Sequence, residues 1–112
     1  MDSTHAISAF SALSQQTRLE VFRLLIKAGA NGLLAGELVE QLDVKQNTMS
    51  ANLTVLLNAG LVRNEREGRA IRYYSNFEAV RGILSFLMEE CCGGRAELCQ
   101  PIIDEIGKNT GS

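Results

Sequence analysis

The fold is decided by the stretch Val44-Lys45-Gln46-Asn47-Thr48-Met49-Ser50-Ala51-Asn52-Leu53. Met49 and Leu53 lie four residues apart, and Leu56 and Leu57 continue the same apolar stripe. This spacing predicts a helix from Gln46 to Ala59 whose apolar side faces the core. The other residues of its leading half are small or polar, so the helix begins with a polar face.

Another helix is predicted only a few residues before this one. Leu34, Leu38 and Leu42 are spaced at i, i+4 and i+8, which predicts a short amphipathic helix that stops near Asp43. Two short helices joined by a tight turn, the second with a polar leading face, form a helix-turn-helix pattern. Gly60 ends the second of them.

The N-terminal part predicts a first helix over residues 4–13, because Ile7, Phe10 and Leu13 recur at intervals of three. Its apolar face has two interpretations, a dimer contact or packing within the monomer. The next helix has an apolar stripe that includes Leu19 and Phe22.

That second helix has a recognisable start and end. Thr17 and Glu20 match a capping box at its start, and Gly29 with Asn31-Gly32 marks its end.

The residue pattern changes its period after Gly60. Residues 61–66 and 70–74 read as two strands, and Glu67-Gly68 supplies the turn of a hairpin. Four arginines lie on or around this hairpin, at Arg63, Arg66, Arg69 and Arg72. A basic hairpin directly after a helix-turn-helix is expected to act as a wing that straddles the DNA backbone.

A last helix is predicted after the hairpin. Residues 75–78 match a second capping box, and a broad apolar face follows, formed by Val80, Ile83, Leu84, Leu87 and Met88. The order of helix, helix, helix-turn-helix, hairpin and helix predicts a winged helix-turn-helix, mainly α with a β-hairpin wing.

Length and charge agree with a small DNA-binding domain. The chain of 112 residues is one domain by length, and its net charge is −2. Residues 45–72 nevertheless carry five basic and two acidic side chains, a net charge of +3. Such a basic island is typical of a phosphate-binding surface, although it is also compatible with an ordinary solvated face.

The N-terminus has Asp2 in place of a basic region, and no apolar run suits a signal peptide or a membrane span. We therefore expect a cytoplasmic protein without a membrane partner. In that reducing compartment, cysteines serve as metal ligands or redox sensors more often than as structural disulfides.

Three separated motifs resemble the ArsR/SmtB family of repressors in order and spacing over roughly residues 6–90. Residues 13–25 resemble the family's opening signature, and residues 44–62 resemble its recognition helix and the following strand. Residues 66–69 with Tyr73-Tyr74 resemble its wing. The resemblance implies a homodimer, built from the first and last helices, that leaves its operator when a metal or metalloid binds.

The chain departs from the family at several positions. Ala51 and Asn52 stand where members commonly have a basic residue and a histidine, which alters two DNA-contact positions. The Cys-Val-Cys metal motif is absent, and residues 36–40 stand in its place. His5 is the only histidine, so the zinc-type site of the last helix cannot be assembled.

The remaining sensor candidates are the only three cysteines, Cys91, Cys92 and Cys99. Thiolates select soft ions, and three of them complete the pyramidal shell of As(III) or Sb(III), whereas structural zinc normally takes four ligands. The pattern Cys-Cys-Gly-Gly-x4-Cys also resembles the C-terminal arsenite site of one branch of the family. The alternatives are a thiol redox switch, for example through a Cys92–Cys99 bond, and cysteines without a sensory role.

We therefore expect a non-enzymatic transcriptional repressor that binds double-stranded operator DNA as a homodimer and is released by As(III) or Sb(III). Residues 1–92 are assigned to DNA binding and dimerisation, and residues 93–112 to a tail that completes the thiolate site. A metalloid-buffering protein is the alternative from another class. The predicted DNA contacts are Gln46, Asn47, Thr48, Ser50, Asn52, Arg63, Arg66, Arg69 and Arg72.

Overall fold

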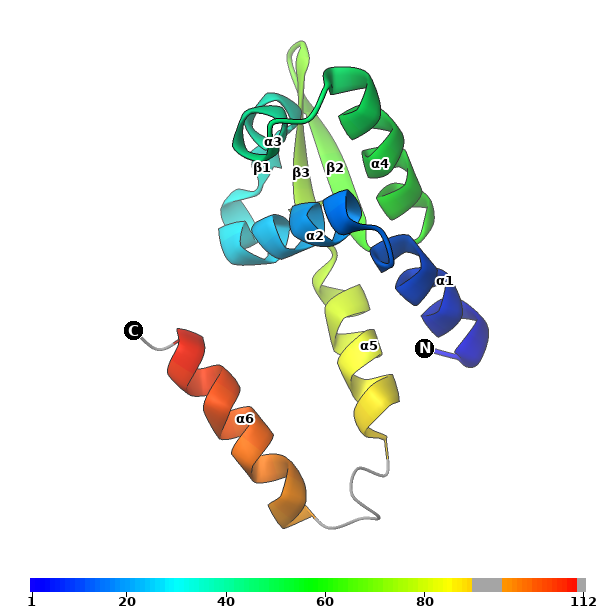
Figure 1. Cartoon of the computed structure of the whole chain (residues 1–112), viewed down its shortest axis with the longest axis vertical. Coiled ribbons are helices and arrows are strands. Elements are labelled where there is room, and N and C mark those ends of the chain that lie inside the picture. Colours follow the sequence, from blue (N-terminus) through cyan, green and yellow to red (C-terminus); the bar gives the residue numbers. More distant parts are fainter. Residues whose placement is uncertain (90–95, 111–112) are drawn as a thin grey trace.

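The computed structural model describes residues 1–89 and 96–110 and shows a mainly helical chain with one small antiparallel sheet (Figure 1). The helices are α1 (Ser3–Leu13), α2 (Gln16–Ala28), α3 (Ala35–Leu42), α4 (Gln46–Asn58), α5 (Phe77–Met88) and α6 (Ala96–Thr110), with a 3-10 turn at Gly29–Asn31. The strands are β1 (Leu33–Leu34), β2 (Val62–Glu67) and β3 (Ala70–Ser75), in the order β1-β3-β2. The predicted winged helix-turn-helix is confirmed.

The core is formed where α2, α3 and α4 meet the hairpin. Leu25 of α2, Leu38 of α3 and Leu56 of α4 are fully buried there, together with Leu61 just before β2. Most of the predicted apolar stripes therefore pack against one another, although Leu19 of the α2 stripe is 43% exposed. This packing, more than the intrinsic propensity of short helices, stabilises the helix-turn-helix.

The turn between α3 and α4 depends on one residue in a rare conformation. Asp43 ends α3 with φ 51° and ψ 48°, in the left-handed region, and its amide donates to the carbonyl of Val39. An aspartate tolerates this region better than most residues because its short polar side chain adapts to it. The chain thereby leaves α3 and enters α4 at Gln46.

The sequence did not predict β1. Leu34 is no part of a helical stripe, because it pairs with Arg72 on β3, and its amide donates to Oε1 of Glu37 at 2.8 Å as α3 begins. Gly32 makes this pairing possible, since a Cβ there would lie 2.4 Å from the carbonyl oxygen of Tyr73. A sheet partner far away in the sequence thus outweighed the local leucine periodicity.

Two helix starts also differ from prediction. The N-cap of α2 is Gln15, whose side chain accepts from the amide of Arg18, so Thr17 lies inside the helix and forms no capping box. The N-cap of α5 is Asn76, which accepts from the amide of Glu78 and donates to the carbonyl of Gly60. The second contact fastens α5 to the end of the helix-turn-helix.

The first helix divides its apolar residues between two faces. The inward face consists of Ala6, Ala9 and Ala12, which are buried against the rest of the chain. Ile7 is 68% exposed and Phe10 38% exposed, so the larger side chains point outward. Of the stripe that predicted the helix, only Leu13 packs against the core of the monomer.

The fifth helix likewise leaves apolar side chains uncovered. Leu84 is 48% exposed and Leu87 59% exposed, and no residue of α5 is buried. Near its middle α5 meets the N-terminal end of the chain, where the Met1 side chain lies against Gly82. Figure 1 shows α5 reaching down from the winged-helix body and α6 running separately beside it. Within the described residues, no helix is long and apolar enough to cross a bilayer.

Candidate nucleic-acid interface and cysteine site

The leading half of α4 presents a polar surface to solvent. Gln46, Asn47, Thr48 and Ser50 are all exposed, while Met49 points into the core. No side chain caps the first turn of α4, so its leading amides remain available to an acceptor such as a phosphate oxygen. These four predicted DNA contacts lie together on one helix end.

Asn52 departs from that arrangement. Its side chain is only 7% exposed, and its Oδ1 accepts a hydrogen bond of 3.1 Å from Nη1 of Arg18. The residue lies on the inner side of α4, because it is one turn before Leu56 and next to Leu53 in the sequence. The structure thus places Asn52 apart from the four exposed residues, with its Oδ1 accepting from Arg18, and its contact with DNA stays a prediction.

One face of the wing holds Arg63 close to its own strand partner. The guanidinium carbon of Arg63 lies 4.2 Å from the ring centroid of Tyr74, the residue opposite it in the β2–β3 register. Nη1 of Arg63 also donates to Oε1 of Glu65 at 3.2 Å. Burial, followed by the negative charge of Glu65, raises the pKa of Tyr74 above its ordinary value of 10.0.

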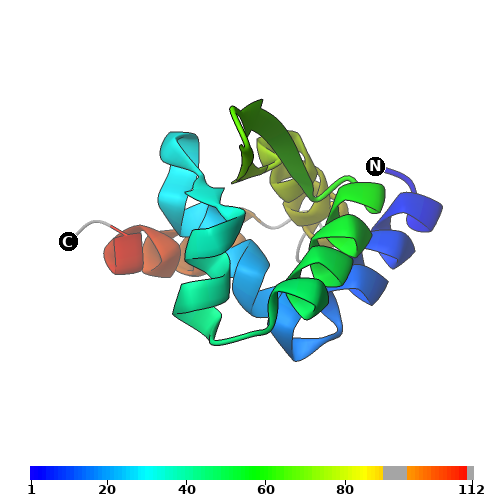
Figure 2. The ribbon, with the colours of Figure 1, turned by 90° about the horizontal axis from the view of Figure 1, so that it is seen from above.

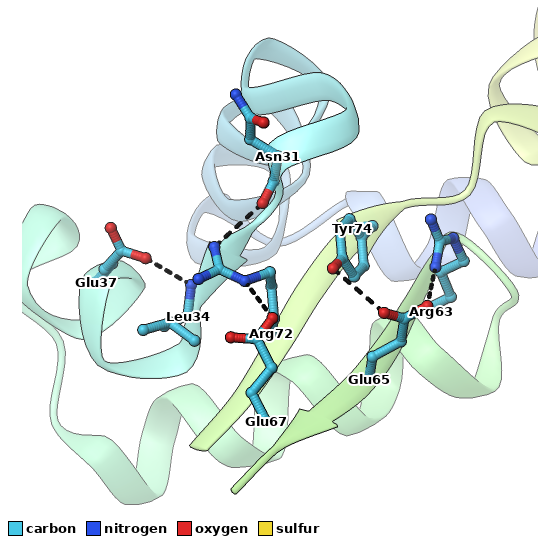
Figure 3. Close-up of polar contacts among 8 residues, drawn as sticks. All are labelled: Asn31, Leu34, Glu37, Arg63, Glu65, Glu67, Arg72 and Tyr74. Carbon is cyan, nitrogen blue, oxygen red and sulfur yellow. Dashed lines mark hydrogen bonds and ion pairs between the residues drawn. The ribbon is translucent and has the colours of Figure 1, made fainter.

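Arg72 is held in a similar way nearer to the hairpin end (Figure 3). Its Nε donates to Oε2 of Glu67 at 2.7 Å, and its Nη1 donates to the carbonyl oxygen of Asn31 at 3.1 Å. The hydrogen bond to Glu67 is the main cause that raises the pKa of Arg72. The contact to Asn31 ties the wing to the turn after α2.

The two remaining wing arginines are different. Arg66 and Arg69 are exposed, and neither forms an ion pair or side-chain hydrogen bond with any residue that the structure describes. Gly68, with φ 63°, forms the turn between them. The four arginines of the wing thus separate into two that organise the wing and two that face solvent near its end.

The cysteine site lies largely outside the described residues, since Cys91 and Cys92 fall in the segment 90–95. Cys99 lies in the first turns of α6, is 8% exposed and is in a disulfide. Over residues 1–89 and 96–110, no three potential ligand side chains are grouped so as to hold a metal ion. The three-thiolate site therefore stays a prediction.

Comparison with known proteins identifies a matching domain model and two relatives of this chain. A model of a helix-turn-helix domain matches residues 13–65. The arsenical resistance operon repressor of Bacillus subtilis (strain 168) is 37% identical over 83 residues, which cover 74% of this chain and 75% of that protein. The HTH-type transcriptional regulator YbzH of the same organism is 31% identical over 96 residues, which cover 75% of this chain and 96% of that protein.

A solved structure agrees in fold and in family. The ArsR-like transcriptional regulator from Rhodococcus sp. RHA1 superimposes with a TM-score of 0.67 at 28% identity, and the match covers 92% of each chain. The relatives described above are transcriptional regulators. The chain belongs to the ArsR family of winged helix-turn-helix transcriptional regulators.

Proposed function

We propose that this protein is a cytoplasmic transcriptional repressor that binds operator DNA as a homodimer and releases it when As(III) or Sb(III) binds Cys91, Cys92 and Cys99. The observation that carries the DNA-binding part is the exposed polar end of α4, whose first turn has no capping side chain. An exposed helix face of this kind fits the major groove of B-DNA.

The DNA contacts follow from exposure and chemistry. Gln46 and Asn47 carry amides that can pair with adenine edges, while Thr48 and Ser50 suit phosphate contacts. Arg66 and Arg69 bind phosphates from the wing because their guanidinium groups have no partner among the described residues. Arg63 and Arg72 keep the wing in shape and contribute to DNA binding mainly through that shape.

The homodimer is supported by the uncovered apolar faces of α1 and α5. Ile7 and Phe10 on α1, and Leu84 and Leu87 on α5, are exposed in the monomer. The two helices are neighbours, since α1 and α5 contact each other directly. Burying such a shared apolar surface in a twofold interface is favourable and brings two copies of α4 to successive major grooves.

The metalloid part is supported by a relative and by donor chemistry. The similar Bacillus subtilis protein is a repressor of an arsenical resistance operon, and the three cysteines supply the three sulfur donors that As(III) and Sb(III) take. Residues 93–112 form the tail that brings Cys99 to the site. Because Cys99 is in a disulfide in this structure, the proposed site requires the reduced chain.

The test is a gel shift with the DNA upstream of the protein's own gene, at constant salt, with the chain kept reduced by a phosphine. The expected result is a complex that dissociates on addition of arsenite and persists with a matched amount of arsenate. A fragment of equal length and scrambled sequence is the control. No binding to the upstream fragment contradicts the DNA-binding part, and a complex that resists arsenite contradicts the metalloid part.

A second candidate function is a repressor of the same fold that senses oxidants or reactive sulfur. The disulfide of Cys99 favours it, because that bond removes a thiolate from the proposed metalloid site. In the same gel shift, release by a mild oxidant without arsenite, reversed by the phosphine, supports this function. A metalloid-buffering protein differs from both because it does not shift the fragment.

A further inference from the structure

Arg18, in the first turn of α2, connects the first helix to the proposed DNA-reading helix. Its Nε donates to the carbonyl oxygen of Ala12 at 2.6 Å, at the end of α1. Its Nη1 donates to Oδ1 of Asn52 at 3.1 Å, in the middle of α4. Among residues 1–89 and 96–110, no other side chain is hydrogen-bonded to both α1 and α4.

Part of the boundary between α1 and α4 is an open groove. Figure 2 shows the two helices running next to each other, and a groove of ≈ 290 Å³ lies between them. Ser8 and Ser11 line it from α1, Val55 and Asn58 line it from α4, and Arg18 lines it as well. Because the side chains that α1 buries in the core are small, such as Ala9 and Ala12, the polar bridge adds a directional restraint on the angle between α1 and α4.

The position of Asn52 makes this bridge sensitive to how α4 is turned. Asn52 is 7% exposed, whereas Ala51 before it is exposed, so the amide marks the inner side of the helix. A rotation or slide of α4 would separate Oδ1 of Asn52 from the guanidinium and leave a buried acceptor unpaired. A hydrogen bond from a charged donor resists such a change more than a neutral one does.

We propose that Arg18 is a positioning residue for sequence recognition, which fixes α4 relative to α1 through Asn52 so that Gln46 and Asn47 meet base edges in register. This inference rests on α4 being the DNA-reading helix of the proposed function. It also gives α1 a second role, because any shift of α1, whose outer face carries Ile7 and Phe10, passes through Arg18 to α4.

The experiment compares specific and non-specific DNA affinity in a double-mutant cycle. Fluorescence anisotropy is measured on the full chain with the upstream fragment and with a scrambled fragment of equal length. The variants are Arg18→Ala, Asn52→Ala and the double variant. Arg23→Ala is the matched control, because Arg23 is an exposed arginine on the same helix and makes no side-chain hydrogen bond or ion pair with a described residue.

Arg18→Ala and Asn52→Ala are each expected to weaken binding to the upstream fragment about tenfold, which corresponds to about 1.4 kcal/mol. Binding to the scrambled fragment should change no more than it does in Arg23→Ala. The double variant should lose no more than either single variant, because both remove the same bridge. Arg18→Lys should behave like Arg18→Ala, since one ammonium group cannot reproduce the fixed fork that reaches both helices.

Several results would overturn the inference. If the losses of the two single variants add in the double variant, Arg18 and Asn52 act independently. Equal losses on both fragments would make Arg18 an ordinary electrostatic contact. Should Arg18→Ala fail to fold, as judged by circular dichroism, Asn52→Ala decides, and unchanged discrimination there contradicts the proposal. If the wild-type chain itself does not discriminate the fragments, the proposed function fails first and the inference fails with it.

Discussion

Nε of Arg72 donates a hydrogen bond of 2.7 Å to Oε2 of Glu67, so two opposite charges of the wing neutralise each other. Arg69 lies between these residues in the sequence but has no such partner among the described residues. Two arginines three positions apart are therefore expected to differ in what they do for DNA binding.

Arg69→Ala should weaken binding to the upstream and scrambled fragments by similar factors, because a phosphate contact carries no sequence information. The slope of log affinity against log salt should become shallower by about 0.9 for each phosphate that the variant no longer neutralises. The control is Arg23→Ala, which removes an exposed arginine of α2 outside the proposed DNA interface and should leave the slope unchanged. A loss confined to the upstream fragment in Arg69→Ala would assign that residue to base reading instead.

The raised pKa of Tyr74 predicts a loss of stability in alkali. In the folded chain the neutral phenol is favoured, so the unfolded chain loses its proton first as the pH rises. The free energy of unfolding should therefore be unaffected by this group below the ordinary pKa and should fall as the pH rises through about 10. Urea unfolding between about pH 8 and pH 11 measures the fall.

Tyr74→Phe should flatten that alkaline fall because the titrating group is gone. Tyr73→Phe is the control, since it removes a hydroxyl at the neighbouring position and keeps Tyr74. If both variants show the same pH profile as the wild-type chain, the alkaline loss of stability has another source.

Two glycines predict opposite effects of an added methyl group. At Gly32, with φ 60°, a Cβ would lie 2.7 Å from Cδ1 of Tyr74, so Gly32→Ala should lower the free energy of unfolding by more than about 1 kcal/mol. At Gly36, in α3, a Cβ meets nothing within 4 Å, so Gly36→Ala should raise it by up to about 1 kcal/mol. Urea denaturation measures the free energy of unfolding of the two variants. Equal effects would show that the close contact at Gly32 does not destabilise the fold.

The proposed dimer predicts that a charged side chain on the outer face of α1 prevents dimer formation. Ile7 is 68% exposed in the monomer, so Ile7→Glu should leave the fold intact but bury a charge in the interface and yield monomers. Sedimentation velocity at several concentrations measures the change. Leu19→Glu is the control, because Leu19 is 43% exposed on α2, outside the proposed interface, and this variant should remain dimeric. A dimeric Ile7→Glu variant would place the interface elsewhere.

The cysteine proposal predicts that all three sulfurs are needed for arsenite. Cys91→Ser, Cys92→Ser and Cys99→Ser should each abolish or strongly weaken arsenite-induced release of reduced protein, because a hydroxyl does not replace a soft thiolate. The affinity for DNA without arsenite should stay at the wild-type value. Two single variants that still respond fully would show that three sulfurs are not required. Loss of an oxidant response in only two of the three would favour the redox function.

The sequence predicted those parts of the fold that depend on local periodicity. The stripes through Leu25, Leu38 and Leu56 became the core, and the turn at Gly68 became the hairpin turn. It did not predict β1, because the pairing of Leu34 with Arg72 joins residues distant in the sequence. The helix cap at Gln15 was missed because glutamine is an unusual capping residue.

The candidate site was predicted less completely than the fold. Exposure of Gln46 and Asn47 follows from the stripe of α4, but the hydrogen-bond partner of Asn52 is Arg18, which lies 34 positions earlier. Similarly, four wing arginines look equivalent in the sequence, and only the side-chain contacts within the folded wing show that Arg63 and Arg72 have partners. The sequence contains one sign of this difference between the wing arginines, because the acidic residues Glu65 and Glu67 lie among them.

The sparse free charge of the wing has a consequence for the released protein. Arg66 and Arg69 are the only wing arginines that lack a partner in the described part of the chain. Each protomer is therefore expected to neutralise few phosphates outside α4, the proposed DNA-reading helix. Sequence-independent affinity grows with the number of phosphates neutralised. In the proposed mechanism the protein is therefore expected to have a weak hold on DNA of other sequences, so that a displaced dimer leaves the promoter clear for polymerase.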